Sequence, residues 1–142
     1  MRGVWGTFAV LMLAAGTAWA KGDVIAGPVE AELLKVVDGD TIVVRAKLWP
    51  TLVTETHVRL KGIDAPELRG HCPAERQLAE KARRFVAKQT AGRPLRLLDV
   101  QQDKYGGRVV ARVEAAGHDL GRQLLKAGLA RKYDGGKRQG WC

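Results

Sequence analysis

Two short acidic clusters are the part of the sequence best suited to chemistry. Residues 38–41 read Asp-Gly-Asp-Thr, and residues 64–67 read Asp-Ala-Pro-Glu. If the two clusters meet in the fold, Asp40 and Asp64 supply hard oxygen ligands of the kind that calcium prefers. Glu67 then stays free as a general base for a water molecule. The spacing fits a simpler structure equally, in which Asp-Gly makes a turn and the second cluster leads into a helix.

Two arginines are candidates for binding a phosphate. Arg59 lies in an alternating run and points away from its neighbours Val58 and Leu60. Arg108 follows a pair of glycines, which let the backbone approach a ligand closely. A guanidinium can bind a phosphate through two parallel hydrogen bonds. The alternative for both residues is an ordinary solvent-exposed arginine.

The elements that must position these residues follow from the hydrophobic pattern. Asp-Gly at 38–39 separates two β-rich runs, which predicts a hairpin. An apolar face at helical spacing begins at Pro73 and stops at Gly92, and a shorter one precedes Gly128. The predicted strands cover residues 33–37, 41–44, 56–63, 95–100 and 109–113, the predicted helices start at 73 and span 119–127, and residues 48–54 and 134–140 are predicted to be irregular.

Five short strands, with a helix between the third and the fourth, are typical of one small barrel. The fold class that we predict is α+β, a five-stranded OB-type β-barrel with two or three helices. Two tryptophans outside the predicted elements, Trp49 and Trp141, fit either stacking on bases or a packed, lid-like role.

The composition excludes an acidic scaffold. The 142 residues include 24 Lys and Arg against 15 Asp and Glu, a net charge of +9, and the pI is near 10.0. With 46% hydrophobic residues the chain can bury a core, so wholesale disorder is excluded as well. An excess of positive charge indicates a polyanionic partner such as nucleic acid.

Residues 1–20 have the features of a secretory signal peptide. Arg2 provides a positive start, residues 4–15 are mostly apolar, and residues 18–20 (Ala-Trp-Ala) fit a cleavage site. The alternative is a membrane anchor, but the apolar run is shorter than the roughly 20 residues that a span needs. We therefore predict a cleaved signal peptide over 1–20, a tether over 21–31 and one folded domain over 32–142.

The sequence contains two cysteines, Cys72 and Cys142. Export makes a disulfide between them plausible, because disulfides persist in oxidising compartments. Closing the loop between Cys72 and Cys142 would add roughly 4 kcal/mol to the free energy of unfolding if the bridge is unstrained. Two free thiols, or pairing with another chain, remain open. A metal site at Cys72 is disfavoured, because no CxxC partner is present.

Four segments together resemble the staphylococcal (micrococcal) nuclease family. They are residues 37–42 (VDGDTI), 58–67 (VRLKGIDAPE), 103–108 (DKYGGR) and 125–130 (LKAGLA). Each segment is weak evidence alone, but their order and spacing match the family over most of the predicted domain. The resemblance implies an OB-fold, calcium-dependent phosphodiesterase that cuts DNA and RNA with little sequence preference.

The resemblance also implies roles for individual residues. Asp40 and Asp64 match the carboxylates that bind calcium, and Ala65 stands where a backbone carbonyl binds the ion. Glu67 matches the residue that the family uses as general base. Arg59 matches one of two arginines that hold the scissile phosphate.

Three more residues of the third segment are carried over from the family. Arg108 matches the second phosphate-binding arginine, Tyr105 matches a tyrosine near the nucleotide's phosphate, and Lys104 is its substrate-binding neighbour. The chain departs from the family here, because an extra glycine places Arg108 one residue late. It also ends in a short glycine-rich tail where the founding member has a third helix, and a Cys72–Cys142 bridge would replace that helix as a clamp.

The resemblance implies DNA and RNA as substrates and Ca²⁺ as cofactor. We expect a monomer, secreted or periplasmic, with no stable membrane association after signal cleavage. The alternative function is a catalytically inactive nucleic-acid-binding OB-fold module. Retention of Asp40, Asp64, Glu67 and Arg59 argues against that alternative, since a pure binder has no need of an acidic pocket that repels phosphate. A structural exported domain is a third hypothesis.

Overall fold

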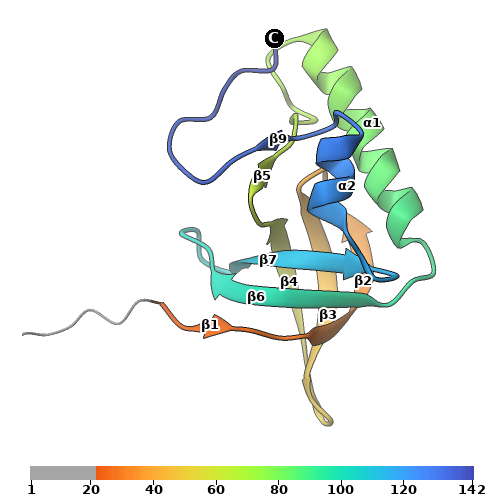
Figure 1. The fold of residues 1–142 in the computed structure, drawn as a ribbon, viewed down its shortest axis with the longest axis vertical. Coiled ribbons are helices and arrows are strands. Elements are labelled where there is room, and N and C mark those ends of the chain that lie inside the picture. The colour runs from red at the N-terminus through yellow and green to blue at the C-terminus, as the bar shows by residue number, and fades with distance from the viewer. Residues whose placement is uncertain (1–21) are drawn as a thin grey trace, which may run out of the picture.

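The computed structural model describes residues 22–142, so the predicted signal peptide lies outside the described residues. Five strands form a barrel, and two helices within the described residues lie at one end of it (Figure 1). The strands are β2 (Val29–Val36), β3 (Thr41–Trp49), β4 (Leu52–Leu60), β6 (Leu95–Gln102) and β7 (Arg108–Ala115), and the helices are α1 (Pro73–Thr90) and α2 (Leu120–Lys126).

Strand pairing closes the barrel. β2, β3 and β4 form an antiparallel meander, and β4 pairs in parallel with β7. β7 returns antiparallel to β6, and β6 pairs with β2 and completes the ring. The predicted α+β, OB-type fold is therefore confirmed, with α1 between β4 and β6 in the chain.

Four short strands extend this framework. β5 (Ile63–Asp64) pairs with β9 (Arg131–Lys132) in a separate two-stranded sheet. β8 (His118–Asp119) pairs with β7, and β1 (Val24–Ile25) pairs with β6. Because β1 pairs with β6 and β2 starts at Val29, the prediction of a tether through residue 31 was wrong in its extent.

The prediction of a loop over residues 48–54 was also wrong. β3 and β4 continue as a long hairpin that turns only at Pro50 and Thr51. Pro50 lies in the turn itself, where its missing N–H costs no ladder bond, so the strands continue on both sides of it.

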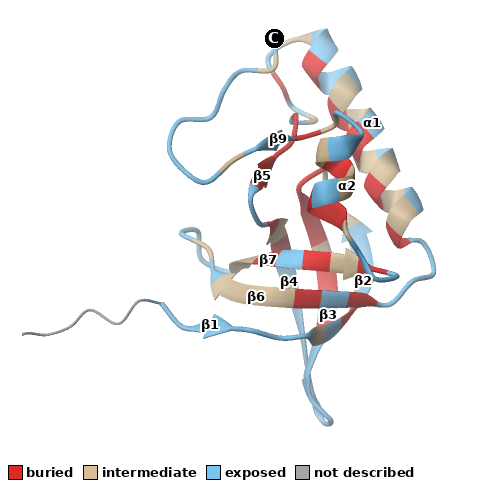
Figure 2. Cartoon of the chain, in the orientation of Figure 1, coloured by how far each residue is buried: buried red, intermediate tan, exposed pale blue. Residues whose placement is uncertain are grey.

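The core lies inside the barrel and between the barrel and the helices (Figure 2). α1 begins at the N-cap Cys72, with Pro73 in its first turn, where proline needs no hydrogen-bond donor. Its small buried residues Ala79 and Ala82 allow close approach to the barrel. No helix within residues 22–142 combines the length and the apolar character needed to span a membrane.

Gly39, in the turn between β2 and β3, is packed too tightly for a side chain. A Cβ at this position would lie 2.7 Å from the Cβ of Ala82 and 3.0 Å from the Cβ of Ala65. We expect Gly39→Ala to lower the free energy of unfolding by about 1–3 kcal/mol, because overpacking forces backbone shifts. Urea denaturation measures this change. Gly106→Ala is the control, since a Cβ there meets nothing within 4 Å, and equal stability of the two variants would contradict the prediction.

Candidate active site

The two acidic clusters predicted from the sequence lie together at the end of the barrel nearest the helices. The pairing of Thr41 with Arg59 sets the start of β3 beside the end of β4. A turn at Gly62, with φ of 80°, then leads the chain into β5 and Asp64. Asp40 and Asp64 are both 4% exposed.

Hydrogen bonds to Asp40 tie the clusters to each other. The backbone N–H of Ala65 donates to Asp40 Oδ2 at 3.0 Å, and the Thr41 hydroxyl donates to Oδ1 at 3.0 Å. On the other side of the turn, Asp38 Oδ1 accepts the backbone N–H of Asp40 at 3.1 Å. Burial, together with the negative charge of Asp40, raises the pKa of Asp38 to about 7. The turn is thus held by its own side chains, and Asp40 is the carboxylate of the pair that faces Arg59.

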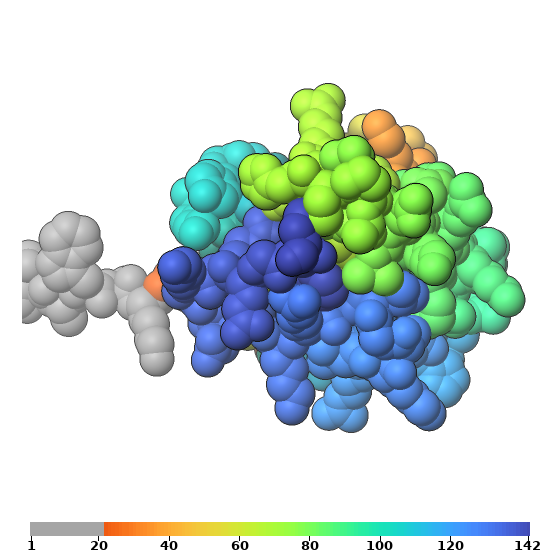
Figure 3. Space-filling view, turned by 90° about the horizontal axis from the view of Figure 1, so that it is seen from above, coloured from red at the N-terminus to blue at the C-terminus, as the bar shows by residue number. Residues whose placement is uncertain are grey.

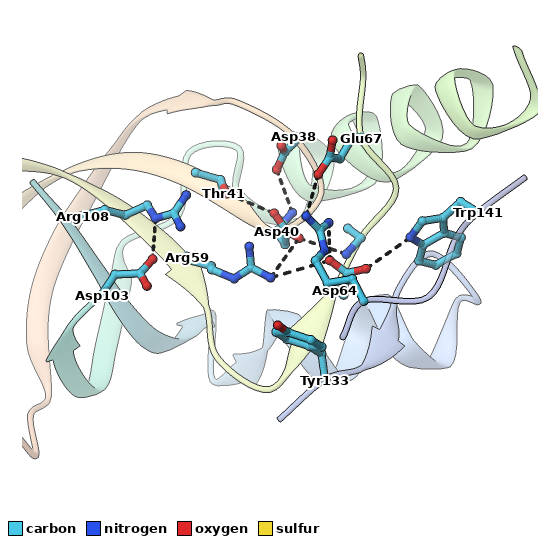
Figure 4. Close-up of polar contacts among 12 residues, drawn as sticks. Asp38, Asp40, Thr41, Arg59, Asp64, Glu67, Asp103, Arg108, Tyr133 and Trp141 are labelled. Carbon is cyan, nitrogen blue, oxygen red and sulfur yellow. Dashed lines mark hydrogen bonds and ion pairs between the residues drawn. The ribbon is translucent and has the colours of Figure 1, made fainter. Parts of the chain in front are cut away.

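Arg59 reaches from β4 into this acidic pair (Figure 4). Its Nη2 lies 3.9 Å from Asp40 Oδ2 and 3.6 Å from Asp64 Oδ1, and its guanidinium carbon lies 5.7 Å from the ring centroid of Tyr133. Both Arg59 Nη2 and Asp64 Oδ1 are buried, and their contacts within the described residues are ion pairs rather than well-aligned hydrogen bonds. A buried guanidinium nitrogen such as Arg59 Nη2 therefore retains the capacity to donate to a further partner.

Glu67 lies at the edge of the acidic cluster, on a loop whose backbone is hydrogen-bonded to the side chain of Glu75. The buried Glu75 side chain accepts the backbone N–H groups of Glu67 at 3.3 Å and of His71 at 3.0 Å. Its carboxyl also fills the space beside Gly70. Glu75 is not among the residues predicted from the sequence, because Cys72 at the N-cap hides the Ser/Thr-x-x-Glu pattern that marks such a residue.

Arg108 is placed apart from the acidic pair and is paired with Asp103 (Figure 4). Its Nε donates to Asp103 Oδ2 at 2.5 Å, and its guanidinium carbon lies 5.1 Å from the Tyr105 ring centroid. Lys104 Nζ lies 5.2 Å from the same centroid. The β6–β7 turn absorbs the extra glycine, with Gly107 at a φ of 76°.

Arg59 and Arg108 nevertheless face one open pocket of about 1160 Å³. The pocket also reaches Lys104, Tyr105 and Tyr133. Positive side chains outnumber acidic ones on its walls, which suits a phosphate backbone. The basic residues that line it are Arg59, Lys61, Lys104, Arg108, Lys132 and Arg138, and the acidic ones are Asp103 and Asp134.

The C-terminal residues also reach the acidic pair, a contact that was not predicted from the sequence. Arg138 contacts both Asp64 and Glu67, at 2.5 and 2.6 Å. Burial alone lowers the pKa of Arg138, but the hydrogen bonds to these two carboxylates outweigh it and raise the pKa overall. Cys142 forms a disulfide with Cys72, one of the pairings that the sequence left open.

The carboxylate oxygens at this end of the barrel fit the ligand preference of a hard divalent cation. Asp40 and Asp64 are buried carboxylates on adjoining elements, and Asp64 Oδ1 has no well-aligned hydrogen bond in the described chain. Oxygen ligands of this kind suit calcium. A second geometric cluster, formed by Cys72, Glu75 and Cys142, does not fit a metal, because its two sulfurs are joined in the disulfide and cannot act as thiolates.

Comparison with known proteins agrees with this geometry. Residues 57–140 match the model of the family described as staphylococcal nuclease homologue. Proteins named "Probable endonuclease LCL3" are similar to the chain: that of Phaeosphaeria nodorum is 35% identical over 92 residues, covering 60% of this chain and 31% of the relative. That of Coccidioides posadasii is 37% identical over 83 residues, covering 55% of this chain and 26% of the relative. The match thus spans less than a third of each relative's length. Since the family match covers more than half of the sequence, the chain belongs to the staphylococcal nuclease family.

Proposed function

We propose that the protein is an exported, calcium-dependent endonuclease that hydrolyses phosphodiester bonds of both DNA and RNA. The observation that carries the proposal is the burial of Asp40 and Asp64 around Arg59, which itself lines the basic pocket. Glu67 belongs to the same cluster, because Arg138 contacts both it and Asp64. The similar fungal proteins are named probable endonucleases, which supports the same activity.

The pocket supports a polynucleotide as substrate. Its basic walls offer charges that replace the counterions of a phosphate backbone. Tyr105 is 59% exposed and presents its ring beside Arg108 and Lys104, an arrangement suited to a base or sugar next to a phosphate. Stacking and phosphate contacts of this kind do not depend on the sugar, which favours action on both nucleic acids.

Asp40, Asp64 and the backbone carbonyl of Ala65 would hold the calcium ion. When bound, the ion supplies electrostatic stabilisation for the negative charge that develops on the phosphate.

The protein's own side chains supply the remaining chemistry. Glu67 takes a proton from the attacking water through its carboxylate, which is half exposed and within reach of solvent. Arg59 donates from its guanidinium to the phosphate oxygens, and its buried Nη2 is the atom with hydrogen-bonding capacity to spare. Arg108 adds a second guanidinium on the pocket wall, once its pairing with Asp103 is exchanged for phosphate.

Export and a monomeric state are part of the proposal. The basic start, the apolar run and the small residues at 18–20 support cleavage of a signal peptide and delivery to the periplasm or the medium.

The test is cleavage of single-stranded DNA and of RNA by the purified protein in calcium chloride and in excess chelator. We expect fragments from both substrates with calcium and none with chelator. Salt-sensitive binding without fragments would replace the proposal with the catalytically inactive nucleic-acid-binding module. Fragments that persist in chelator would overturn the metal dependence.

A further inference from the structure

The last ten residues form a strap across the candidate site; we use "strap" for residues 133–142. At its start, the backbone N–H of Tyr133 donates to the Gly62 carbonyl at 2.9 Å, directly after β9 pairs with β5. At its end, Cys142 is bonded to Cys72 at the start of α1. Both ends are therefore attached, and Figure 3 shows the C-terminal residues (dark blue) lying against the segment that precedes α1.

Within the strap, Arg138 contacts the carboxylates of Asp64 and Glu67, on which the proposed chemistry depends. Its Nη2 lies 2.5 Å from Asp64 Oδ1 and its Nη1 lies 2.6 Å from Glu67 Oε1. Asp64 Oδ1 is buried, and Arg138 is its nearest positive partner, since Arg59 Nη2 lies farther away at 3.6 Å. One guanidinium thus contacts the candidate metal ligand and the candidate base at once.

Trp141 covers the other oxygen of Asp64. Its indole N–H donates to Asp64 Oδ2 at 3.3 Å (Figure 4). Arg131 holds the tryptophan in place, with its guanidinium carbon 3.8 Å from the ring centroid and a hydrogen bond of 2.7 Å to the Gly140 carbonyl. Both carboxylate oxygens of Asp64 consequently have a partner from the strap.

A divalent cation on Asp64 Oδ1 needs the lone pairs that Arg138 Nη2 already contacts at 2.5 Å, and the two positive charges repel each other at that separation. Arg59 Nη2 stays 3.6 Å from the same oxygen and does not occupy it in this way. We propose that Arg138 is an internal competitor of the metal ion, and that the Cys72–Cys142 bridge keeps it in place. A divalent cation binds by displacing Arg138 from Asp64, which also releases Glu67 to act on water. This inference rests on the proposed function, because it concerns the same metal-binding carboxylates.

The bridge determines how strongly Arg138 competes. With both ends of the strap attached, Arg138 acts at a high effective concentration and returns to Asp64 rapidly whenever it leaves. With the bridge open, the far end of the strap keeps only its non-covalent contacts, such as the hydrogen bond of Trp141 to Asp64, and the effective concentration of Arg138 falls. Reduction of the disulfide is therefore expected to tighten metal binding, which makes the site sensitive to the redox state of its surroundings.

The test is the calcium dissociation constant of the whole protein, measured by titration calorimetry without substrate. We expect Arg138→Gln to bind calcium roughly tenfold more tightly than the unchanged protein, as the loss of one charged hydrogen-bonded competitor implies. Lys137→Gln is the matched control: it removes the same charge from the adjacent strap residue, which is exposed. We expect Lys137→Gln to change the constant by less than about twofold.

A second pair of variants tests the bridge. Cys72→Ser combined with Cys142→Ser opens the strap while retaining a side chain suited to the N-cap of α1. We expect this variant to bind calcium more tightly, and we expect Arg138→Gln to add little in the opened background, because both changes remove the same competition.

Equal effects of Arg138→Gln and Lys137→Gln would overturn the inference, since net charge alone would then explain the result. An unchanged constant in Arg138→Gln, or no calcium binding in any variant, would overturn it as well. Failure of the proposed nuclease function appears separately, as absence of DNA fragments at saturating calcium.

Discussion

Replacing Glu67 by glutamine is expected to lower kcat for cleavage of single-stranded DNA by roughly 10²–10⁴-fold. The amide keeps the shape of the side chain, but it cannot accept the proton of the attacking water. The backbone of Glu67 stays in place, because Glu75 holds its N–H. Initial rates across a range of DNA concentrations separate kcat from KM, and a loss confined to kcat is the expected result.

Two features of the experiment isolate the role of this carboxylate. Rates are measured at saturating calcium, because Glu67→Gln also removes one partner of Arg138. Glu55→Gln is the control: Glu55 is an exposed carboxylate on β4 that pairs with Arg45, and its loss should leave kcat unchanged. Equal rates for Glu67→Gln and Glu55→Gln would exclude Glu67 as the base.

Replacing Arg59 by lysine is expected to lower kcat by roughly 10²–10³-fold, the scale of removing one preorganised donor. Lysine keeps the charge near Asp40 and Asp64 but loses the planar fork that binds two phosphate oxygens. The buried Nη2, which has no well-aligned hydrogen bond in the described chain, is the atom whose loss matters. Steady-state kinetics measures the effect, and thermal unfolding shows that the fold is retained.

Arg96→Lys is the matched control for this experiment. Arg96 lies on β6 and contacts Glu114 at 3.8 Å, outside the basic pocket, so its replacement should not change kcat. The kcat of Arg108→Lys is a second comparison. Arg108 also lines the pocket, but its guanidinium is already paired with Asp103. If Arg59→Lys retained full activity, the phosphate-binding role of Arg59 would have to be abandoned.

Much of the barrel could be predicted from local patterns. Asp-Gly between two β-rich runs marked the β2–β3 hairpin, and an apolar face after Pro73 marked α1, because turn chemistry and side-chain periodicity act between near neighbours. Spacing left open whether the two acidic clusters meet, and the resemblance to the staphylococcal nuclease family implied that they do. The structure places Asp40, Asp64 and Arg59 together.

The errors arose where strand pairing overrides the preference of a single segment. Residues 48–54 were predicted to be irregular, yet the ladder between β3 and β4 continues along the hairpin to the pair Trp49 and Leu52. The segment before residue 32 had no strong pattern, and β6 supplies the partner that makes β1 a strand. Neither partner can be deduced from the residues of the segment itself, because strand propensity depends on context.

The sequence by itself determined the elements of the barrel, the excess of positive charge and the residue types of the candidate site. Only the tertiary structure decided that Arg138 lies on Asp64 and Glu67, and that Trp141 covers the remaining oxygen of Asp64. Arg138 and Glu67 are 71 positions apart, and no periodicity or motif relates residues at that separation. Their contact depends on the path of the strap, which the pairing of β9 with β5 and the bond between Cys72 and Cys142 establish together.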